Sequence, residues 1–455
     1  MINGSFRTYL EEAIGSSNAL VAFSAFEKPA SVAIRLNPRK KGCALQGRPV
    51  PWSPHGVLLD ERPKFTLDPL FHAGAYYVQD SSSMFVGHVF RHVLGLVRRP
   101  HGHPLRVLDL CAAPGGKTTD LAASLREHVG DDFILVANEV MKARVGVLAD
   151  NVALWGDPNV VVTSDDPRAF ASLPGFFDII LADVPCSGEG MFRKDEQAQE
   201  QWSVDNVALC EARQRRIVAD VWPSLAQGGA FIYSTCTFNR HENDGNVDWI
   251  AAGLGARVVE DDLAEGFDGI IRTEHGYSLV PGHVEGEGQY CAAMIRESDL
   301  QITDLRCGRT DVKVQPLSGV GIDILKVKAS YSLRGETVIA VPQSLENDVA
   351  TLRRSLHVVA AGCAVGTMKG KLFIPGADLA LSAALDPEAF PRAEVDRRTA
   401  LEYLHRDAIT LPDAEKGYVL VCHQGLPLGF VKNLGNRCNS LHPQSRRIRM
   451  DIDQL

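Results

Sequence analysis

The stretch LDLCAAPGGKT, at residues 108–118, decides the fold class of this chain. It joins an apolar run, typical of a buried strand, to a segment at 118–128 that has the spacing of a helix. Small residues between the two let a ligand approach the backbone, and the free N–H groups at a helix start attract an anion. The stretch therefore predicts a strand, a ligand-binding loop and a helix in succession.

The same alternation continues along the chain. Apolar runs bounded by turn residues predict five strands, at 106–110, 133–138, 159–163, 177–182 and 230–234. The segments between them predict helices at 118–128, 141–154 and 205–226. Strands that alternate with helices are typical of an α/β fold, in which a mainly parallel sheet is covered on both faces.

Polar or reactive residues follow these strands, namely Cys111, Glu139, Asp183, Cys186 and Cys236. Ligands of such sheets bind beyond the carboxyl ends of the strands. Glu139 lies 23 residues after Gly116, close to the spacing at which an acid accepts hydrogen bonds from a ribose in dinucleotide-type folds. The pattern predicts one functional site at this edge of the sheet.

Two cysteines at this edge lie in turns of small and hydroxyl residues, DVPCSGEG at 183–190 and STCT at 234–237. A single cysteine is most often buried filler. Two of them beside an acid instead favour a nucleophilic site, because a thiolate reacts when a nearby cation lowers its pKa. Lys117, Arg193 and Lys194 are the available cations.

Two alternatives remain for the loop after the first strand. Gly116-Lys117-Thr118 matches the end of the P-loop motif GxxxxGK[ST] of NTPases. However, Cys111 occupies the place of its first glycine, and Pro114 removes one N–H group from the phosphate cradle. The second alternative is a tight turn that binds no ligand.

Composition sets the limits of these interpretations. The chain has 455 residues, of which 45% are hydrophobic and 23% charged, which is typical of several globular domains. It has no apolar run long enough to cross a membrane. We expect no secretory signal, because MINGSFRTYL lacks a basic region followed by an apolar stretch. Ten cysteines without a CxxC pair argue against a metal framework. We therefore expect free thiols, no metal and a cytoplasmic location.

Charge is unevenly distributed along the chain. The net charge is −9, yet residues 241–350 hold 9 basic and 19 acidic residues, whereas residues 351–455 hold 14 and 11. This difference predicts a domain boundary near 300–350. Four basic residues cluster near the N-terminus, and they are equally consistent with an RNA-contact patch and with a solvated loop after an edge strand: Arg35, Arg39, Lys40 and Lys41.

The three motifs at 108–118, 183–190 and 234–237 together resemble those of the RNA 5-methylcytosine methyltransferases of the NOL/NOP/Sun family. The segment YYVQDSS at 76–82 supports this resemblance. Near the C-terminus, KGK at 369–371 and GFVKNLGNR at 429–437 are similar to the PUA-like module of bacterial RsmF (YebU)-type 16S rRNA methyltransferases.

The resemblance implies a Rossmann-like methyltransferase core that depends on S-adenosylmethionine. It implies four parts: an N-terminal RNA-binding region at 1–70, the catalytic core at 71–300, a connecting subdomain at 301–350 and a PUA-like RNA-binding domain at 351–455. Near the C-terminus, a basic cluster formed by Arg437, Arg446, Arg447 and Arg449, with Lys432 close in sequence, is expected to contact phosphates. The alternative is a solubilising tail.

The resemblance also assigns roles to individual residues. Cys236 would be the nucleophile that attacks cytosine, Cys186 the second cysteine, and Asp183 a neighbour of both the base and the cofactor. Asp166 would lie near the adenine of the cofactor, although Asp165 is adjacent. The remaining S-adenosylmethionine contacts would be Cys111, Ala112, Ala113, Pro114, Gly115, Gly116, Lys117 and Glu139.

The implied activity is methylation of carbon 5 of cytosine in rRNA, with 16S rRNA favoured. A tRNA substrate is the main alternative, and a P-loop NTPase or a non-catalytic RNA-binding assembly factor are the others. The expected partner is RNA, as rRNA alone or in a small ribosomal subunit or its precursor. We expect a monomer that does not contact a membrane.

Overall fold

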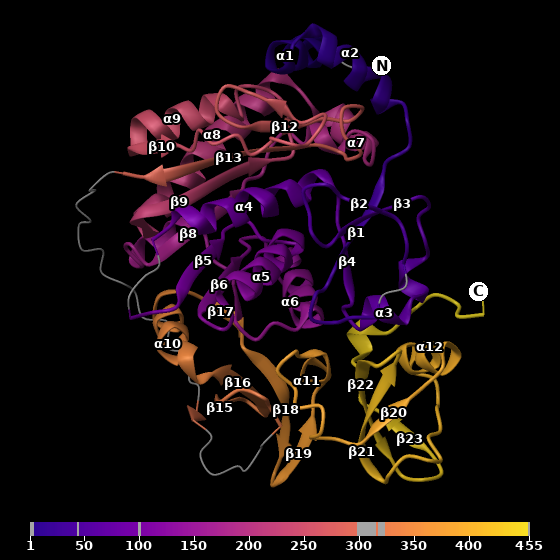
Figure 1. Ribbon diagram of the computed structural model, residues 1–455. Coiled ribbons are helices and arrows are strands. Elements are labelled where there is room, and N and C mark those ends of the chain that lie inside the picture. Colours follow the sequence, from indigo (N-terminus) through magenta and orange to yellow (C-terminus); the bar gives the residue numbers. More distant parts are fainter. Residues whose placement is uncertain (1–3, 43–44, 99–101, 298–314, 317–323, 454–455) are drawn as a thin grey trace.

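The computed structural model describes residues 4–42, 45–98, 102–297, 315–316 and 324–453. An α/β core occupies the middle of the molecule (Figure 1). Two N-terminal helices, α1 (Gly4–Ile14) and α2 (Ser16–Phe26), lie at one end of it, and two small β-rich modules lie at the other. No helix in these residue ranges combines the length and the apolar character that a membrane span requires.

The core is built on a ten-stranded sheet in the order β11-β12-β13-β9-β8-β5-β6-β7-β17, with β10 paired to β13. Its central five strands are parallel, whereas β13 and β17 run antiparallel to their neighbours. The parallel strands are β5 (Leu105–Asp109), β6 (Phe133–Asn138), β7 (Val160–Thr163), β8 (Phe177–Asp183) and β9 (Leu225–Thr235). The others are β10 (Ala256–Val258), β11 (Ile271–Arg272), β12 (Tyr277–Leu279), β13 (Gln289–Arg296) and β17 (Val358–Ala361).

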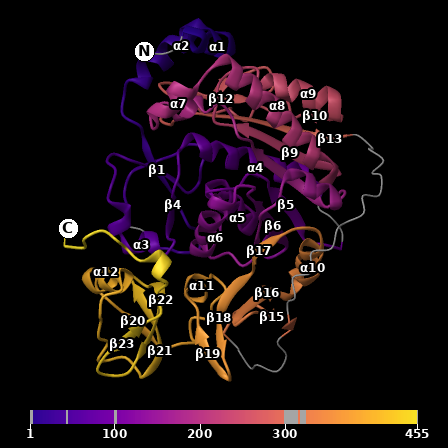
Figure 2. The ribbon, with the colours of Figure 1, turned by 180° about the vertical axis from the view of Figure 1, so that it is seen from behind.

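Helices cover both faces of this sheet, as Figure 2 shows from behind. One hydrophobic core joins the strands to α4 (Phe85–Leu96), α5 (Gly116–Val129) and α6 (Lys142–Trp155). A second core joins the other face to α8 (Val204–Val221), α9 (Asp244–Leu254) and α10 (Glu346–Ser355). Every residue of β6 is buried, which explains why the strands are continuous apolar runs rather than alternating ones.

The five predicted strands and the α/β fold are confirmed, with one correction at the third predicted helix. The sequence predicted a helix over 205–226, but α8 ends at Val221. Pro223 follows within the short 3-10 helix Trp222–Ser224, and proline has no N–H to continue an α-helix. The next strand begins at Leu225 and includes Gly228 and Gly229.

The N-terminal sheet has the order β2-β3-β1-β4. Its strands are β1 (Val32–Leu36), β2 (Arg48–Pro49), β3 (Gly56–Leu59) and β4 (Tyr76–Val78). Strand β1 is not an edge strand, as one of the two alternatives for the basic cluster had it, because β1 pairs with both β3 and β4. The sheet also extends past residue 70, where the sequence placed the end of the N-terminal region.

Two further sheets follow the core. The first has the order β14-β15-β16-β18-β19, and the second has the order β20-β21-β22-β23. Their strands are β14 (Gln315–Pro316), β15 (Ala329–Arg334), β16 (Thr337–Pro342), β18 (Cys363–Lys369), β19 (Leu372–Pro375), β20 (Arg392–Glu394), β21 (Gly417–His423), β22 (Leu426–Asn433) and β23 (Cys438–Ser440). The first sheet joins residues on both sides of 350, and residues 301–314 and 317–323 of the predicted connecting subdomain lie outside the described residues.

The two ends of the chain share a hydrophobic core. Ile34 and Tyr76 of the N-terminal sheet belong to the same buried cluster as Tyr403, Val421 and Ile448 of the C-terminal module. Helix α3 (Pro69–His72) accordingly packs against α12 (Arg397–His405), next to which the C-terminus lies (Figure 1). This shared core holds the N-terminal sheet and the last module together along one side of the catalytic core.

Candidate active site

The predicted site residues gather at the carboxyl edge of the parallel strands. Cys111 follows β5, Glu139 follows β6, Asp183 ends β8 and Cys236 follows β9. Strands β8 and β9 are direct neighbours, and their register pairs Asp183 with Ser234. The loops that follow these two strands therefore start side by side.

Cys186 and Cys236 converge at this point. Their Sγ atoms lie 3.2 Å apart, and both residues are half-buried. The two loops are tied together by a hydrogen bond from the Gly190 N–H to the Cys236 carbonyl (2.8 Å) and by a bond between the Ser187 and Thr237 hydroxyls (2.9 Å). The pairing of two sulfur atoms is thus imposed by the loops around them.

This pairing affects the protonation of the two thiols. The hydrogen bond with Cys236, together with burial, raises the pKa of Cys186 well above its ordinary value. Cys186 therefore keeps its proton to a higher pH than an ordinary cysteine thiol.

A buried polar network that the sequence did not predict holds the cysteine loops. The Glu242 carboxylate accepts hydrogen bonds from the Ser187 N–H (3.0 Å) and the Gln214 amide (2.7 Å). It also accepts one from Asn239 (2.8 Å), whose amide donates to Glu189 as well (2.9 Å). Burial raises the pKa of Glu242 to about 7. Glu242 was not predicted, because an acid three residues after an asparagine in a loop is not a recognisable motif in a single sequence.

Asp183 is fixed by three side chains. The Lys117 ammonium donates to its Oδ2 atom at 2.8 Å. The Ser234 hydroxyl (2.7 Å) and the Gln289 amide (3.2 Å) donate to Oδ1. Burial opposes the charge of Lys117, but the Asp183 carboxylate outweighs it and raises the pKa of Lys117. Gln289 was missed in the sequence because it comes from β13, far along the chain.

The three cations expected near the thiols differ in their partners. Cys236 contributes electrostatically to the raised pKa of Lys117, so this ammonium interacts with Cys236 as well as with Asp183. Arg193 instead pairs with Glu287 at 2.8 Å, and Lys194 lies 3.5 Å from Asp80. Of the three cations, Lys117 is therefore the one that interacts with Cys236.

The loop at 111–117 has the open backbone that its sequence predicted. Gly115 has a φ of +111°, which is accessible to glycine, and α5 begins at the next residue. Helix α6 holds the loop from outside, since Asn151 donates to the Pro114 carbonyl at 2.8 Å and Arg144 to the Ala113 carbonyl. The Ala113–Pro114 peptide bond is cis.

Arg35 reaches the same loop from the N-terminal sheet. Its side chain is fully buried and donates to the Gly116 carbonyl (3.2 Å), the Thr119 hydroxyl and the Gln79 side chain (2.8 Å). Lys40 is buried too. Its ammonium donates to the Ala73 and Leu154 carbonyls at 2.8 and 2.6 Å, and burial lowers its pKa to about 7. The prediction of one exposed basic cluster was therefore wrong for these two residues.

Two carboxylates border the loop. Glu139 is buried, accepts from the Met141 N–H at 2.8 Å and lies 3.2 Å from Arg144. Asp109 accepts from the Thr118 hydroxyl at 2.6 Å, while its buried Oδ1 atom has no hydrogen-bond partner among the described residues. Burial raises the pKa of Asp109 to about 7. Both acids thus stand at strand ends next to the open backbone.

The adjacent acids Asp165 and Asp166 point to different partners. Asp165 accepts from the His357 N–H at 2.8 Å. Asp166 caps the short 3-10 helix Pro167–Ser172 through the Arg168 N–H and lies 3.5 Å from the Arg216 guanidinium. Asp166, which was predicted to lie near the adenine, is therefore exposed, and its carboxylate lies against the Arg216 guanidinium.

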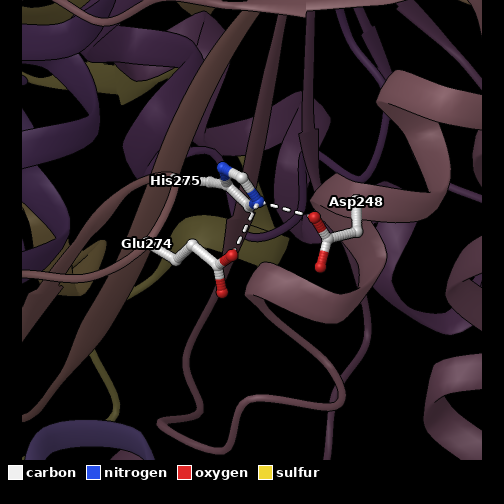
Figure 3. Close-up of side chains that lie close together, drawn as sticks. All are labelled: Asp248, Glu274 and His275. Carbon is white, nitrogen blue, oxygen red and sulfur yellow. Dashed lines mark hydrogen bonds and ion pairs between the residues drawn. The ribbon is translucent and has the colours of Figure 1, made fainter.

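Asp248, Glu274 and His275 form a separate cluster on the surface (Figure 3). The His275 Nε2 atom lies 2.6 Å from Asp248 and 4.0 Å from Glu274. The Arg240 guanidinium also contacts both carboxylates. Because side chains of the chain itself match these charges, we assign no ligand to this cluster.

The residues of the predicted basic cluster at the C-terminus differ in how far they are exposed to solvent. Arg446 is mostly buried and pairs with Asp150 of α6 at 2.9 Å and with Asp378 at 2.7 Å. The prediction that it contacts phosphate was wrong, because its donors already bind these carboxylates. Arg447 is half-buried, and the residues that remain exposed are Lys432, Arg437 and Arg449.

Family models match three parts of the chain. Residues 96–295 match the 16S rRNA methyltransferase RsmB/F. Residues 2–81 match the N-terminal domain of 16S rRNA methyltransferase RsmF, and residues 390–448 match the methyltransferase RsmF PUA domain. The fold and these matches define a methyltransferase that depends on S-adenosylmethionine.

Curated relatives extend the match to nearly the whole chain. Ribosomal RNA small subunit methyltransferase F from Salmonella agona is 31% identical over 97% of this chain and 95% of its own length. The protein of the same name from Serratia proteamaculans is 32% identical over 87% of this chain and 84% of its own. The chain belongs to this family of rRNA methyltransferases, RsmF.

Solved structures agree with the fold. A methyltransferase homolog from Pyrococcus horikoshii is 25% identical, with a TM-score of 0.51 over 65% of this chain and all of the other. NSun6 from the same organism, solved with SFG, an S-adenosylmethionine analogue, is 19% identical with a TM-score of 0.53 over 65% of this chain and 99% of the other. The second likeness shows the shared fold alone.

The described residues fit S-adenosylmethionine. The positive φ of Gly115 opens the backbone to a ligand, and Glu139 supplies a carboxylate at the end of the second strand for ribose hydroxyls. The unpartnered Oδ1 atom of buried Asp109 is an acceptor that a cationic ligand group would satisfy.

Proposed function

We propose that this protein methylates carbon 5 of a cytosine in 16S rRNA through a covalent bond between Cys236 and the base. The observation that carries the proposal is the 3.2 Å separation of the Cys186 and Cys236 Sγ atoms beside Asp183. Carbon 5 of cytosine is too weakly nucleophilic to take a methyl group directly. A thiolate that adds to carbon 6 makes carbon 5 reactive and divides one difficult step into easier ones.

The first step belongs to Cys236. Its thiolate attacks carbon 6, and the electron pair of the 5,6 double bond moves through carbon 4 to the ring N3, which takes up a proton from solvent. Asp183 is the proposed partner of N3 and of the exocyclic amine, and its carboxylate is oriented by Lys117, Ser234 and Gln289. S-adenosylmethionine supplies an electrophilic methyl group when it is bound.

The last step belongs to Cys186. Once Cys236 is bonded to carbon 6, its sulfur no longer pairs with the Cys186 thiol as a free thiol does, so the hydrogen bond that is the first cause of the raised pKa of Cys186 is weakened. Cys186 can then lose its proton to solvent, and its thiolate removes the hydrogen from carbon 5. The carbon 5–carbon 6 double bond forms again as the bond to Cys236 breaks and N3 releases its proton.

The target base must lie outside a stacked duplex, because the Cys236 thiolate must reach carbon 6 and the methyl donor must reach carbon 5. The match to an RsmF PUA domain and the names of the relatives favour 16S rRNA over tRNA as the source of this base. The P-loop alternative is disfavoured because a cis-proline loop that starts at Cys111 lacks the glycine and the N–H group of a phosphate cradle.

Bisulfite sequencing of total RNA tests this proposal directly. RNA from cells with the gene, without it, and with the Cys236→Ala variant would be compared. We expect at least one 16S cytosine to resist conversion only when the intact gene is present. Protection of a tRNA cytosine instead would assign the substrate to tRNA, and protection of no cytosine would reject the proposed chemistry.

A further inference from the structure

A cavity of about 600 Å³ lies between the N-terminal sheet, helix α6 and the C-terminal tail. Its lining includes Phe71 and Tyr77 from the N-terminal part, Trp155 from α6 and Met450 from the tail. This volume is in the range of sites that bind small molecules. Three parts of the chain that are far apart in sequence thus enclose one space.

The lining has a distinctive chemistry. It combines the aromatic rings of Phe65, Phe71, Tyr77 and Trp155 with two exposed cations, and it contains no acidic residue. One of these cations, Arg62, lies over the ring of Phe65 at 5.5 Å. Aromatic rings beside cations are the groups on which unpaired bases stack and to which phosphates bind. Both features suit a nucleotide of single-stranded RNA.

The cavity is connected to the catalytic loop. Tyr77 lies between them, since a Cβ atom added to Gly116 would be 3.2 Å from the Tyr77 ring. Asn151 also lines the cavity, and it donates to the Pro114 carbonyl. The residue after Gly116 is Lys117, which binds Asp183. A nucleotide in this cavity would therefore be separated from the cofactor loop by one layer of side chains.

We propose that this cavity binds an unpaired nucleotide of the substrate RNA, a neighbour of the cytosine that is methylated. Its base stacks on Phe71 and Tyr77, and Arg62 and Lys64 contact its phosphates. The inference rests on the proposed function, because it takes RNA as the substrate. It adds a binding site, formed by the N-terminal part and the C-terminal tail, that fixes the RNA beside the catalytic loop.

The test uses the full-length protein and a protein-free 16S rRNA transcript. Arg62→Gln combined with Lys64→Gln removes two exposed charges and leaves the core intact. We expect the slope of log K against log salt to fall by roughly 1.4, since each phosphate contact of a single strand contributes about 0.7. KM for RNA should rise while kcat and the Kd for S-adenosylmethionine stay unchanged.

The stacking role is tested at Phe71, which is half-buried. Phe71→Leu keeps most of the apolar volume but has no aromatic face, so it separates stacking from packing. We expect RNA affinity to fall at least about fivefold, because base–aromatic stacking is worth about 1–3 kcal/mol. The melting temperature reports whether the fold is kept, and Phe71→Tyr, which retains the ring, should restore binding.

The matched control is Arg257→Gln. Arg257 is an exposed arginine of β10, at the far edge of the main sheet from α6 (Figure 1), and its loss should leave the salt slope unchanged. The proposal is overturned if the Arg62/Lys64 variant binds RNA with the affinity and salt slope of the wild type, or if Phe71→Leu binds RNA as well as Phe71→Tyr.

Failure of the proposed function would look different. Mass spectrometry of the digested transcript then finds no 5-methylcytidine with the wild-type protein, whereas RNA binding by the cavity is still measured. Conversely, all the cavity variants could form 5-methylcytidine normally and have the KM of the wild type. That result would reject the nucleotide site in the cavity and leave the proposed methylation standing.

Discussion

The Sγ atoms of Cys186 and Cys236 lie 3.2 Å apart although 50 residues separate them in sequence. Adjacent parallel strands, β8 and β9, bring the two loops together. Because the two thiols share one environment, their chemistry can be separated only by changing one at a time. Cys236→Ala and Cys186→Ala each remove one of the two thiols.

Cys236→Ala should abolish methylation and every covalent protein–RNA adduct, because no nucleophile remains to activate carbon 5. Affinity for S-adenosylmethionine should persist, and equilibrium binding of the cofactor measures it. Cys438→Ala, in the C-terminal module, is the matched control and should keep full activity. Residual methylation by the Cys236 variant would assign the nucleophile elsewhere.

Cys186→Ala should accumulate an adduct that survives SDS, because Cys236 still adds to carbon 6 and carbon 5 still takes the methyl group of S-adenosylmethionine, but no group removes the carbon 5 hydrogen. Gel shift of labelled RNA in SDS measures the adduct. The double variant that also carries Cys236→Ala should show none. If the single variant turns over normally without a trapped adduct, Cys186 is not the base.

The stability of the fold should fall as pH rises through about 5 to 7. Burial raises the pKa of both Glu242 and Asp109 to about 7, above the ordinary values that these groups regain on unfolding. The native state therefore binds more protons than the unfolded state in this pH range. As the pH rises, the contribution of each group to the free energy of unfolding falls by about 3 kcal/mol.

The melting temperature, measured from pH 4.5 to 8, tests this dependence. In the Glu242→Gln variant, the melting temperature should decrease less with rising pH than in the wild type. The part of the decrease that is due to Asp109 should remain. An identical pH dependence in the two proteins would show that Glu242 does not titrate in this range.

Arg446→Gln should destabilise the contact between the C-terminal module and the core. The guanidinium is largely buried and pairs with Asp150 and Asp378, and hydrogen bonds to charged groups are worth about 1.5–3 kcal/mol. Urea unfolding should show a lower midpoint, whereas Arg449→Gln, at an exposed residue, should not change it. Equal midpoints would show that Arg446 contributes no stability.

Arg35→Lys should weaken cofactor binding, by about tenfold if one hydrogen bond to a charged group is lost. Lysine keeps the charge but cannot donate at once to the Gly116 carbonyl, Thr119 and Gln79 as the arginine fork does. Calorimetric titration with S-adenosylmethionine measures the effect. Arg48→Lys, an exposed arginine of the same sheet, is the control, and equal affinities in the two variants would reject a positioning role for Arg35.

The sequence alone determined the order of strands and helices and the residues at the strand ends. This was possible because a buried parallel strand must be a continuous apolar run and because glycine marks the open turn at Gly115. Motifs at 108–118, 183–190 and 234–237 also indicated the family, since the residues within each motif follow each other closely along the chain.

Tertiary structure alone decided which strands are neighbours and which charges are buried. The adjacency of β8 and β9 places Cys186 against Cys236, and no local pattern encodes strand order. Arg35, Lys40 and Arg446 were read as surface cations because basic residues are usually exposed. Each is buried against carbonyl or carboxylate oxygens from distant segments, and those partners exist only after the domains have packed together.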